Sequence, residues 1–154
     1  MAPGDQAADR LRDVLERIAD AAGLDATVSV QASEDGLHAE YGGDDLGLLI
    51  GHNGQTIDAI QHLAFRIVAR VVDERMPVVV DAAGFRERRA LVLKATADQA
   101  AQAAIAEHRA VALESMTALE RKVIHEHLKE RGDVETYSEG DEPSRHLVVA
   151  PLVD

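Results

Sequence analysis

Four residues, Gly51-His52-Asn53-Gly54, constrain the chain most strongly, because two glycines bracket two polar residues between two apolar segments. Gly51 can adopt a positive φ at little cost, and Gly54 allows another backbone to approach closely. The segments on either side carry apolar residues at helical spacing. The sequence therefore predicts a helix, a tight turn and a second helix. The apolar positions are Leu46, Leu49 and Ile50 before the turn, and Ile57, Ile60, Leu63, Ile67 and Val71 after it.

The second helix begins at this turn, so its free N–H groups and the positive end of its dipole lie there. Such a helix end favours a phosphate group. An αα-hairpin with a glycine turn needs no ligand, however, and a lone Gly-x-x-Gly is a weak motif. Both interpretations stay open on the tetrapeptide alone.

The residues around the turn resemble the KH domain, which binds nucleic acid. Ile-Gly-x-x-Gly lies at a helix–helix turn and is followed by Gln-Thr-Ile-Asp-Ala-Ile-Gln-His-Leu. In that family the loop holds about four nucleotides of a single strand by their backbone. The resemblance implies RNA contacts at Gly51, His52, Asn53, Gly54, Gln55 and Thr56.

The first half of the chain predicts the element order α-β-β-α-α-β. We expect helices over 6–22, 44–50 and 55–72, and strands over 26–31, 37–41 and 78–80. Asp5 and Asp44 are the expected N-caps, and Gly23 the expected helix stop. This order is the one that a resemblance to a type II KH domain implies, with the helices packed on one face of a three-stranded sheet.

The second half predicts a small α-β-α-β-β unit after a boundary near residues 81–84. A long Ala-rich helix covers 85–107, with Leu93, Ala97, Ala100 and Ala104 on its contact face. Strands are expected over 111–113, 134–138 and 146–150. Thr117 and Glu120 fit a capping box, so a helix begins after Thr117. Its expected core stripe is Leu119, Val123, Ile124 and Leu128, and Gly132 is its expected stop.

Arg121 and His125 lie four residues apart on that capped helix and therefore share one face. Arginine offers five donors to a phosphate, histidine can donate to it near neutral pH, and Lys122 is adjacent. A solvated helix surface explains the same spacing equally well. The surrounding residues, Glu120 to His125 and Asp133 to Pro143, closely resemble the Arg-xxx-His (R-3-H) domain, which is associated with single-stranded nucleic acids. The resemblance implies RNA contacts at an exposed Arg121, at Lys122 and at His125.

A KH domain joined to an R-3-H domain resembles the bacterial Jag family, also called SpoIIIJ-associated or KhpB-type proteins. We therefore expect an α+β protein with a KH domain at 1–83 and an R-3-H domain at 84–154. The resemblance implies RNA binding, a second small KH protein as partner, and a role in cell elongation and envelope growth. Many relatives carry a further N-terminal domain, so this chain is expected to be a short form. Relatives also usually hold a basic residue in the loop, where this chain has His52-Asn53.

The net charge of −12 is concentrated at the two ends of the chain. Residues 1–50 carry −8, residues 51–131 carry +1 and residues 132–154 carry −5. The middle can thus hold local basic patches, although two Phe and two Tyr leave little scope for extended base stacking. A histidine titrates near pH 6.5, so binding at His52 is expected to tighten as the pH falls. Without Cys, a leader-like N-terminus or an 18-residue apolar run, the chain is expected to be cytoplasmic.

An enzyme and a protein-binding scaffold are the two alternatives to an RNA-binding protein. Nothing resembles a catalytic constellation, a P-loop or a nucleophile elbow, so we expect no enzyme activity and no cofactor. His125 and His127 lie about 200° apart on a helix, which argues against a metal site. A protein-binding scaffold fits the acidic balance and the uncharged loop, and it is the main alternative to RNA binding.

Overall fold

The structure is a computed structural model that describes residues 2–72 and 75–153. The chain divides into two compact units, Met1–Arg86 and Glu87–Asp154. Unit 1 and unit 2 each contain a three-stranded sheet and a separate hydrophobic core. The element order confirms the predicted α+β class and the predicted succession of helices and strands in each half.

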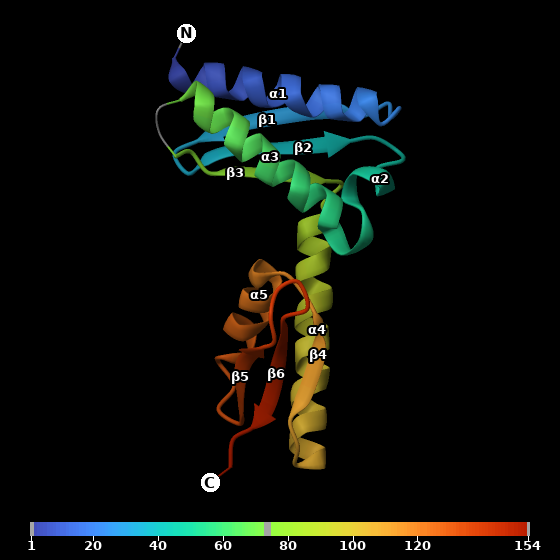
Figure 1. The fold of residues 1–154 in the computed structure, drawn as a ribbon, viewed down its shortest axis with the longest axis vertical. Coiled ribbons are helices and arrows are strands. Elements are labelled where there is room, and N and C mark those ends of the chain that lie inside the picture. The colour runs from blue at the N-terminus through green and yellow to red at the C-terminus, as the bar shows by residue number, and fades with distance from the viewer. Residues whose placement is uncertain (1, 73–74, 154) are drawn as a thin grey trace. The chain divides into compact units, whose positions relative to one another are not determined.

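Unit 1 is a layer of helices on one face of a sheet (Figure 1). Strand β1 pairs antiparallel with β2, and β2 pairs parallel with β3, so β2 is central. Helices α1 and α3 lie side by side over the sheet (Figure 1). In chain order the elements are α1 (Pro3–Ala21), β1 (Thr27–Ser33), β2 (Gly36–Gly42), α2 (Gly47–Ile50), the 3-10 turn η1 (His52–Gly54), α3 (Gln55–Val71) and β3 (Val78–Ala82).

The core of unit 1 follows from strand alternation. Leu37, Ala39 and Tyr41 of β2 all point to the helical layer and are buried. The Tyr41 hydroxyl donates to the Leu15 carbonyl of α1 at 2.6 Å, and burial raises the pKa of Tyr41 well above its ordinary value. This hydrogen bond ties the first helix to the central strand.

Three details of unit 1 differ from the sequence predictions. The N-cap of α1 is Ala2, and Asp5 lies inside the first turn. Helix α2 begins after Leu46, so Asp44 caps nothing. Leu63 is 49% exposed because it lies about 120° around the helix axis from Ile57. The buried stripe of α3 is instead Ile57, Ile60, Ala64 and Val68, and Val71 is 38% exposed.

Unit 2 contains an antiparallel sheet in the order β4-β6-β5 together with two helices. The small side chains predicted for the contact face of α4 are buried, and they share a core with Ile124 and Leu128 of α5. The elements are α4 (Phe85–Glu107), whose first two residues belong to unit 1, β4 (Val111–Ser115), α5 (Ala118–Leu128), β5 (Val134–Glu139) and β6 (His146–Pro151).

Helix α5 begins as predicted, and Ile124 and Leu128 of its expected stripe are buried, whereas Val123 is half-buried. Oγ1 of Thr117 accepts from the Glu120 N–H at 3.3 Å, which confirms Thr117 as the N-cap. Leu119, expected in the core, is 62% exposed. It lies about half a turn around the axis from Leu128, so it cannot face the same core. The helix ends at Leu128, before Gly132.

Candidate nucleic-acid interface

The loop Gly51–Gly54, called the glycine loop below, requires both of its glycines. Gly51 has φ 73°, and a Cβ there would lie 2.1 Å from Oγ1 of Thr56. Gly54 has φ 82°, and a Cβ there would lie 2.5 Å from ring carbon Cε1 of Phe85. The predicted positive φ of Gly51 is therefore confirmed. What approaches Gly54 is an aromatic ring, not the backbone that the sequence suggested.

The glycine loop presents its polar side chains to solvent. His52 and Asn53 are exposed, and Nδ2 of Asn53 lies 3.3 Å from Nε2 of His52. Asn53 itself has φ 52° and ψ 27°, a left-handed conformation that asparagine tolerates well. Two consecutive left-handed residues, Asn53 and Gly54, turn the chain into α3.

The N-terminus of α3 is open to a ligand. Its N-cap is Gly54, and none of the described side chains caps the helix. Gln55 and Thr56 of the first turn are exposed. The Gln55 N–H already donates to the His52 carbonyl, so the remaining N–H groups of the first turn and the dipole of a 17-residue helix lie directly behind the glycine loop.

One carboxylate, Asp58, lies in the same first turn and would repel an anion. Its Oδ1 accepts from Nη1 of Arg86 at 2.8 Å. Arg86 also donates from Nε to the Val80 carbonyl and from Nη2 to Oε1 of Gln61, each at 2.9 Å. Arg86 thus neutralises the acid nearest to a loop that has no Lys or Arg of its own.

The second predicted set of residues, Arg121, Lys122 and His125, lines one pocket of unit 2. The pocket has a volume of about 410 Å³ and lies beside α5 and β5. We call it the α5–β5 pocket. The other polar or aromatic residues that line it are Thr136, Tyr137, Ser138 and Arg145.

The predicted exposure of Arg121 is wrong. Only 7% of the residue is exposed. Nη1 donates to the carbonyls of Met116 and Arg145 at 2.6 and 3.4 Å, and Nη2 donates to Oε1 of Glu142 at 2.6 Å. The guanidinium holds the segment before β6 against α5, because the carbonyls of Met116 and Arg145 and the Glu142 carboxylate already accept from its donors. Arg121 is therefore a positioning residue in this structure, not a free phosphate donor.

The solvent-facing groups of the α5–β5 pocket are Lys122, His125 and Tyr137. Lys122 and His125 are exposed, and Nδ1 of His125 is hydrogen-bonded to Oγ1 of Thr136. Tyr137 is 47% exposed and offers a ring for base stacking. Arg145 bonds the Gly140 carbonyl through Nη1 at 2.6 Å.

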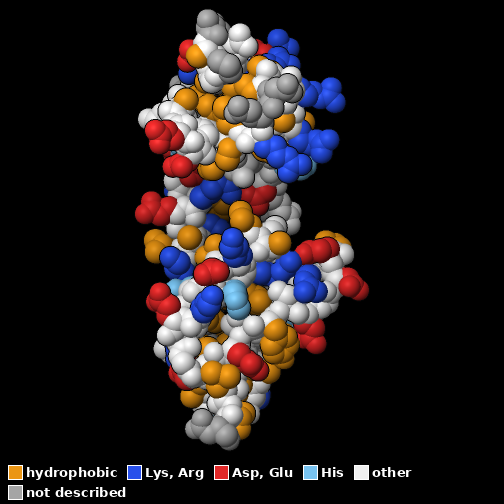
Figure 2. Space-filling view, turned by 90° about the vertical axis from the view of Figure 1, so that its left-hand side faces the viewer, with side chains coloured by type: hydrophobic (Ala, Val, Ile, Leu, Met, Phe, Trp, Pro, Cys, Tyr) orange, Lys and Arg blue, Asp and Glu red, His pale blue; other side chains and the backbone are white. Residues whose placement is uncertain are grey.

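Sequence reasoning did not select Tyr137 and Arg145, although a signal was present. Tyr137 is one of two tyrosines in the chain, and Arg145 is the one basic residue of 132–154. On the face seen in Figure 2, Lys and Arg side chains lie among Asp and Glu and exposed hydrophobic atoms, so no continuous basic field is visible there.

Metal sites and membrane spans were both sought among the residues that the structure describes, and neither is found there. Residues 2–72 and 75–153 contain no cluster of three or more His, Asp or Glu side chains suited to a metal ion. His125 contacts Thr136, whereas Nε2 of His127 lies 2.9 Å from Oδ1 of Asp98. Within the same residues, every helix is too short or too polar to cross a bilayer.

Comparison with known proteins agrees with this geometry. Residues 8–81 match the family "KhpA/KhpB, KH domain", and residues 91–151 match the R-3-H domain. The chain is 34% identical over 144 residues to the RNA-binding protein KhpB of Clostridium symbiosum, covering 92% of this chain and 65% of the relative. The chain belongs to the KhpB family.

Other KhpB relatives match at comparable levels. Identity to the RNA-binding protein KhpB of Bacillus subtilis is 33% over 138 residues, covering 88% of this chain and 66% of the relative. Identity to the RNA-binding protein KhpB of Lactiplantibacillus plantarum is 43% over 104 residues, covering 68% of this chain and 32% of the relative. The chain thus spans between about a third and two thirds of the length of these KhpB proteins.

The buried position of Arg121 predicts a stability defect when it is lost. Arg121→Ala removes the partner of Glu142 and leaves the Met116 carbonyl without its donor, so unit 2 should lose about 1–3 kcal/mol. Urea denaturation measures this loss. Lys122→Ala, the exposed neighbour on the same helix, should stay within about 0.5 kcal/mol of the parent. Equal stabilities for the two variants would contradict a positioning role.

Proposed function

We propose that the chain binds single-stranded RNA, with the glycine loop and the α5–β5 pocket as two contact sites. The observation that carries the proposal is the uncapped N-terminus of α3 behind the exposed His52-Asn53 pair. Helix ends of this kind bind phosphate groups, and KH loops hold a single strand by its backbone. The names of the KhpB relatives support the same function.

The proposed contacts follow the accessibility of the groups. The backbone N–H of Thr56, the exposed side-chain amides of Asn53 and Gln55 and the His52 ring would bind phosphate in unit 1. In unit 2, Lys122 and His125 would contact phosphate, and the Tyr137 ring would stack on a base. Arg121, which is buried, forms part of the wall of the α5–β5 pocket. Extended contacts with many phosphates are not expected, because few of these groups carry a permanent charge.

The site of action in the cell is proposed from family membership. We infer a post-transcriptional regulator or RNA chaperone linked to cell elongation and envelope growth, in the cytoplasm, working with a second small KH protein. The name "KhpA/KhpB" of the matched KH family supports such a partner. Crosslinking in cells, followed by sequencing of the bound RNA and mass spectrometry of bound proteins, tests both parts.

Acidic substitutions in the glycine loop test whether phosphate binds at the uncapped N-terminus of α3. His52→Asp with Asn53→Asp keeps the turn but puts two carboxylates where phosphate should lie, so affinity should fall about tenfold or more. Fluorescence anisotropy with labelled short single-stranded RNA at fixed salt measures this. His62→Asp with Ala69→Asp adds the same two acidic side chains to exposed positions further along α3 and should bind nearly as the parent does. Unchanged affinity in the loop variant would favour a protein-binding scaffold.

The Arg86–Asp58 ion pair leads to a second prediction, which compares a single variant with a double variant. Arg86→Gln exposes the Asp58 charge beside the helix N-terminus, and RNA affinity should fall about two- to fivefold. Asp58→Asn in the same protein should restore it, because no carboxylate is left to repel phosphate. Melting temperatures of all variants separate this effect from unfolding. A double variant as weak as Arg86→Gln would mean that Arg86 acts through structure alone.

Tyr137 provides the test for unit 2. Tyr137→Ala should lower RNA affinity by about 1–3 kcal/mol through the loss of one stacked base, whereas Tyr137→Phe keeps the ring and should bind normally. Both variants change the same exposed side chain, so the stability of unit 2 should be unaffected. The same anisotropy titration measures both variants. Normal binding by Tyr137→Ala would exclude the α5–β5 pocket as a stacking site.

A further inference from the structure

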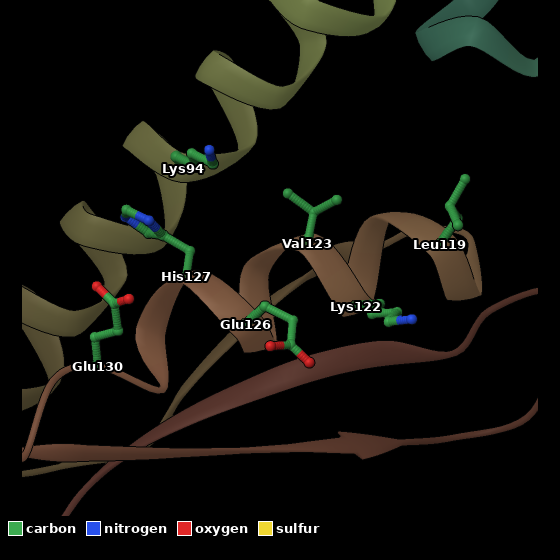
Figure 3. Close-up of a pocket in the computed structure, with 7 residues that line it drawn as sticks. All are labelled: Lys94, Leu119, Lys122, Val123, Glu126, His127 and Glu130. Atoms are coloured by element: carbon green, nitrogen blue, oxygen red, sulfur yellow. The ribbon is translucent and has the colours of Figure 1, made fainter. Parts of the chain in front are cut away.

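The two histidines of helix α5 have different kinds of hydrogen-bond partner. Nδ1 of His125 is bonded to Oγ1 of Thr136, a hydroxyl on β5. Nε2 of His127 lies 2.9 Å from Oδ1 of Asp98, a carboxylate on α4, and the His127 ring lies beside that helix (Figure 3). The two rings therefore differ both in the nitrogen that is bound and in the chemistry of the partner.

Thr136 is held in place by strand pairing. It lies in the middle of β5, opposite Val149 of the central strand β6. Val134, two residues earlier and thus on the same face of the strand, is buried in the core that includes Ile124 of α5. Thr136 is therefore on the face of the sheet that packs against α5, and it is half-buried. Its hydroxyl offers His125 a partner whose position the sheet determines.

The second ring nitrogen of His125, Nε2, is open to a ligand. It has no hydrogen-bond partner within residues 2–72 and 75–153. His125 is exposed, and so is Lys122, which lies one turn earlier on α5 and lines the same α5–β5 pocket. Because Nδ1 is bonded to β5, Nε2 is the nitrogen that remains for a ligand in the pocket.

The partner at Nδ1 decides what Nε2 can do. Phosphate oxygens only accept hydrogen bonds, so a neutral ring can contact a phosphate only when its proton is on Nε2. A partner that only accepts, such as a carboxylate, would draw that proton to Nδ1 and leave Nε2 as an acceptor. A hydroxyl can donate or accept. It can therefore donate to Nδ1 of a neutral ring, and after rotation accept from Nδ1–H of a protonated ring, so that Nε2–H is present in both states.

We propose that Thr136 is a positioning residue for His125. Its hydroxyl donates to Nδ1 of the neutral ring and thereby presents Nε2–H to a phosphate in the α5–β5 pocket. This inference rests on the proposed function, because it takes the phosphate of a single-stranded RNA as the ligand. It adds that the His125 contact needs no positive charge on the ring. Asp98 cannot serve His127 in this way, because a carboxylate has no proton to donate.

The hydroxyl also fixes the orientation of the ring. An exposed side chain that is free to rotate loses this freedom when a ligand binds, and the loss lowers affinity. A ring that β5 already holds avoids much of this cost. The contribution of one hydrogen bond then sets the expected effect of Thr136 on RNA affinity at about three- to tenfold.

NMR spectra that correlate ring protons with ring nitrogens measure the protonated nitrogen directly. They are recorded on the full chain near pH 8, where an ordinary histidine is neutral. The signals of His125 are those that are missing in His125→Ala. The parent should show the form protonated at Nε2. Thr136→Val, which replaces the hydroxyl by a methyl group of similar size, should show a mixture of both neutral forms, and Thr136→Ser should restore the parent spectrum. The signals of His127 should stay the same in all three proteins.

Anisotropy titrations with labelled short single-stranded RNA test the effect on binding. Thr136→Val should lower the affinity about three- to tenfold, and Thr136→Ser should stay within about twofold of the parent. Thr96→Val makes the same replacement at an exposed threonine of α4 outside the pocket, and it should bind as the parent does. Melting temperatures show whether any variant has lost its fold.

A double-mutant cycle separates a role through the ring from a direct or structural one. His125→Ala should weaken RNA binding, and Thr136→Val in that background should cause no further loss, because Thr136 acts only through the imidazole. A stable protein in which Thr136→Val weakens binding equally with and without His125 would show that Thr136 contacts RNA itself or shapes β5.

Three results would overturn the proposal: a parent ring protonated at Nδ1, normal RNA binding by Thr136→Val, or an equal loss in both arms of the cycle. Normal RNA binding by His125→Ala would remove the phosphate contact of the proposed function, and with it this role of Thr136. The ring spectra need no RNA, so they show whether the failure lies in the protonation of the ring or in the binding of RNA.

Discussion

The ring of Phe85 occupies the space that a side chain at position 54 would need, and the conformation of the glycine loop depends on that contact. Thr56 fills the corresponding space at Gly51. Both glycines are packed in this way and have positive φ, so the loop keeps its conformation, and no side chain caps the N-terminus of α3 among the described residues. The chemical property that matters, a helix end open to an anion, is thus a consequence of steric packing beneath the loop.

Arginines in both units serve mainly to pair with carboxylates. Arg86 neutralises Asp58, Arg89 bonds Glu120, and Arg121 bonds Glu142. The charge count along the sequence therefore overstates the cations available to a polyanion. For a chain with net charge −12, the proposed RNA binding would depend on directed hydrogen bonds and stacking, with little contribution from long-range attraction.

Apolar periodicity and turn residues were sufficient to predict the order of the elements, because both depend on local sequence. Tertiary neighbours decided the rest. Spacing placed Arg121 and His125 on one face, but it could not reveal that β6 and its preceding segment cover Arg121. The contact of Phe85 with Gly54 likewise depends on residues distant in the chain, whereas the exposure of Leu119 follows from its position half a turn around α5 from Leu128. Tyr137 and Arg145 join the pocket only when β5 and β6 pack beside α5.

Lys122 lines the α5–β5 pocket and also a second hollow of unit 2, of about 610 Å³, that is lined by Lys94 of α4 and by residues of α5. A single ammonium group cannot satisfy a phosphate on one side and a carboxylate on the other at full strength. Under the proposed RNA contact at Lys122, a ligand in either hollow would lower the affinity of the other, and thermodynamic reciprocity would make the two penalties equal. One side chain shared by two hollows would thus give unit 2 the means for negative heterotropic coupling between a nucleic acid and a second ligand, with no change in the backbone.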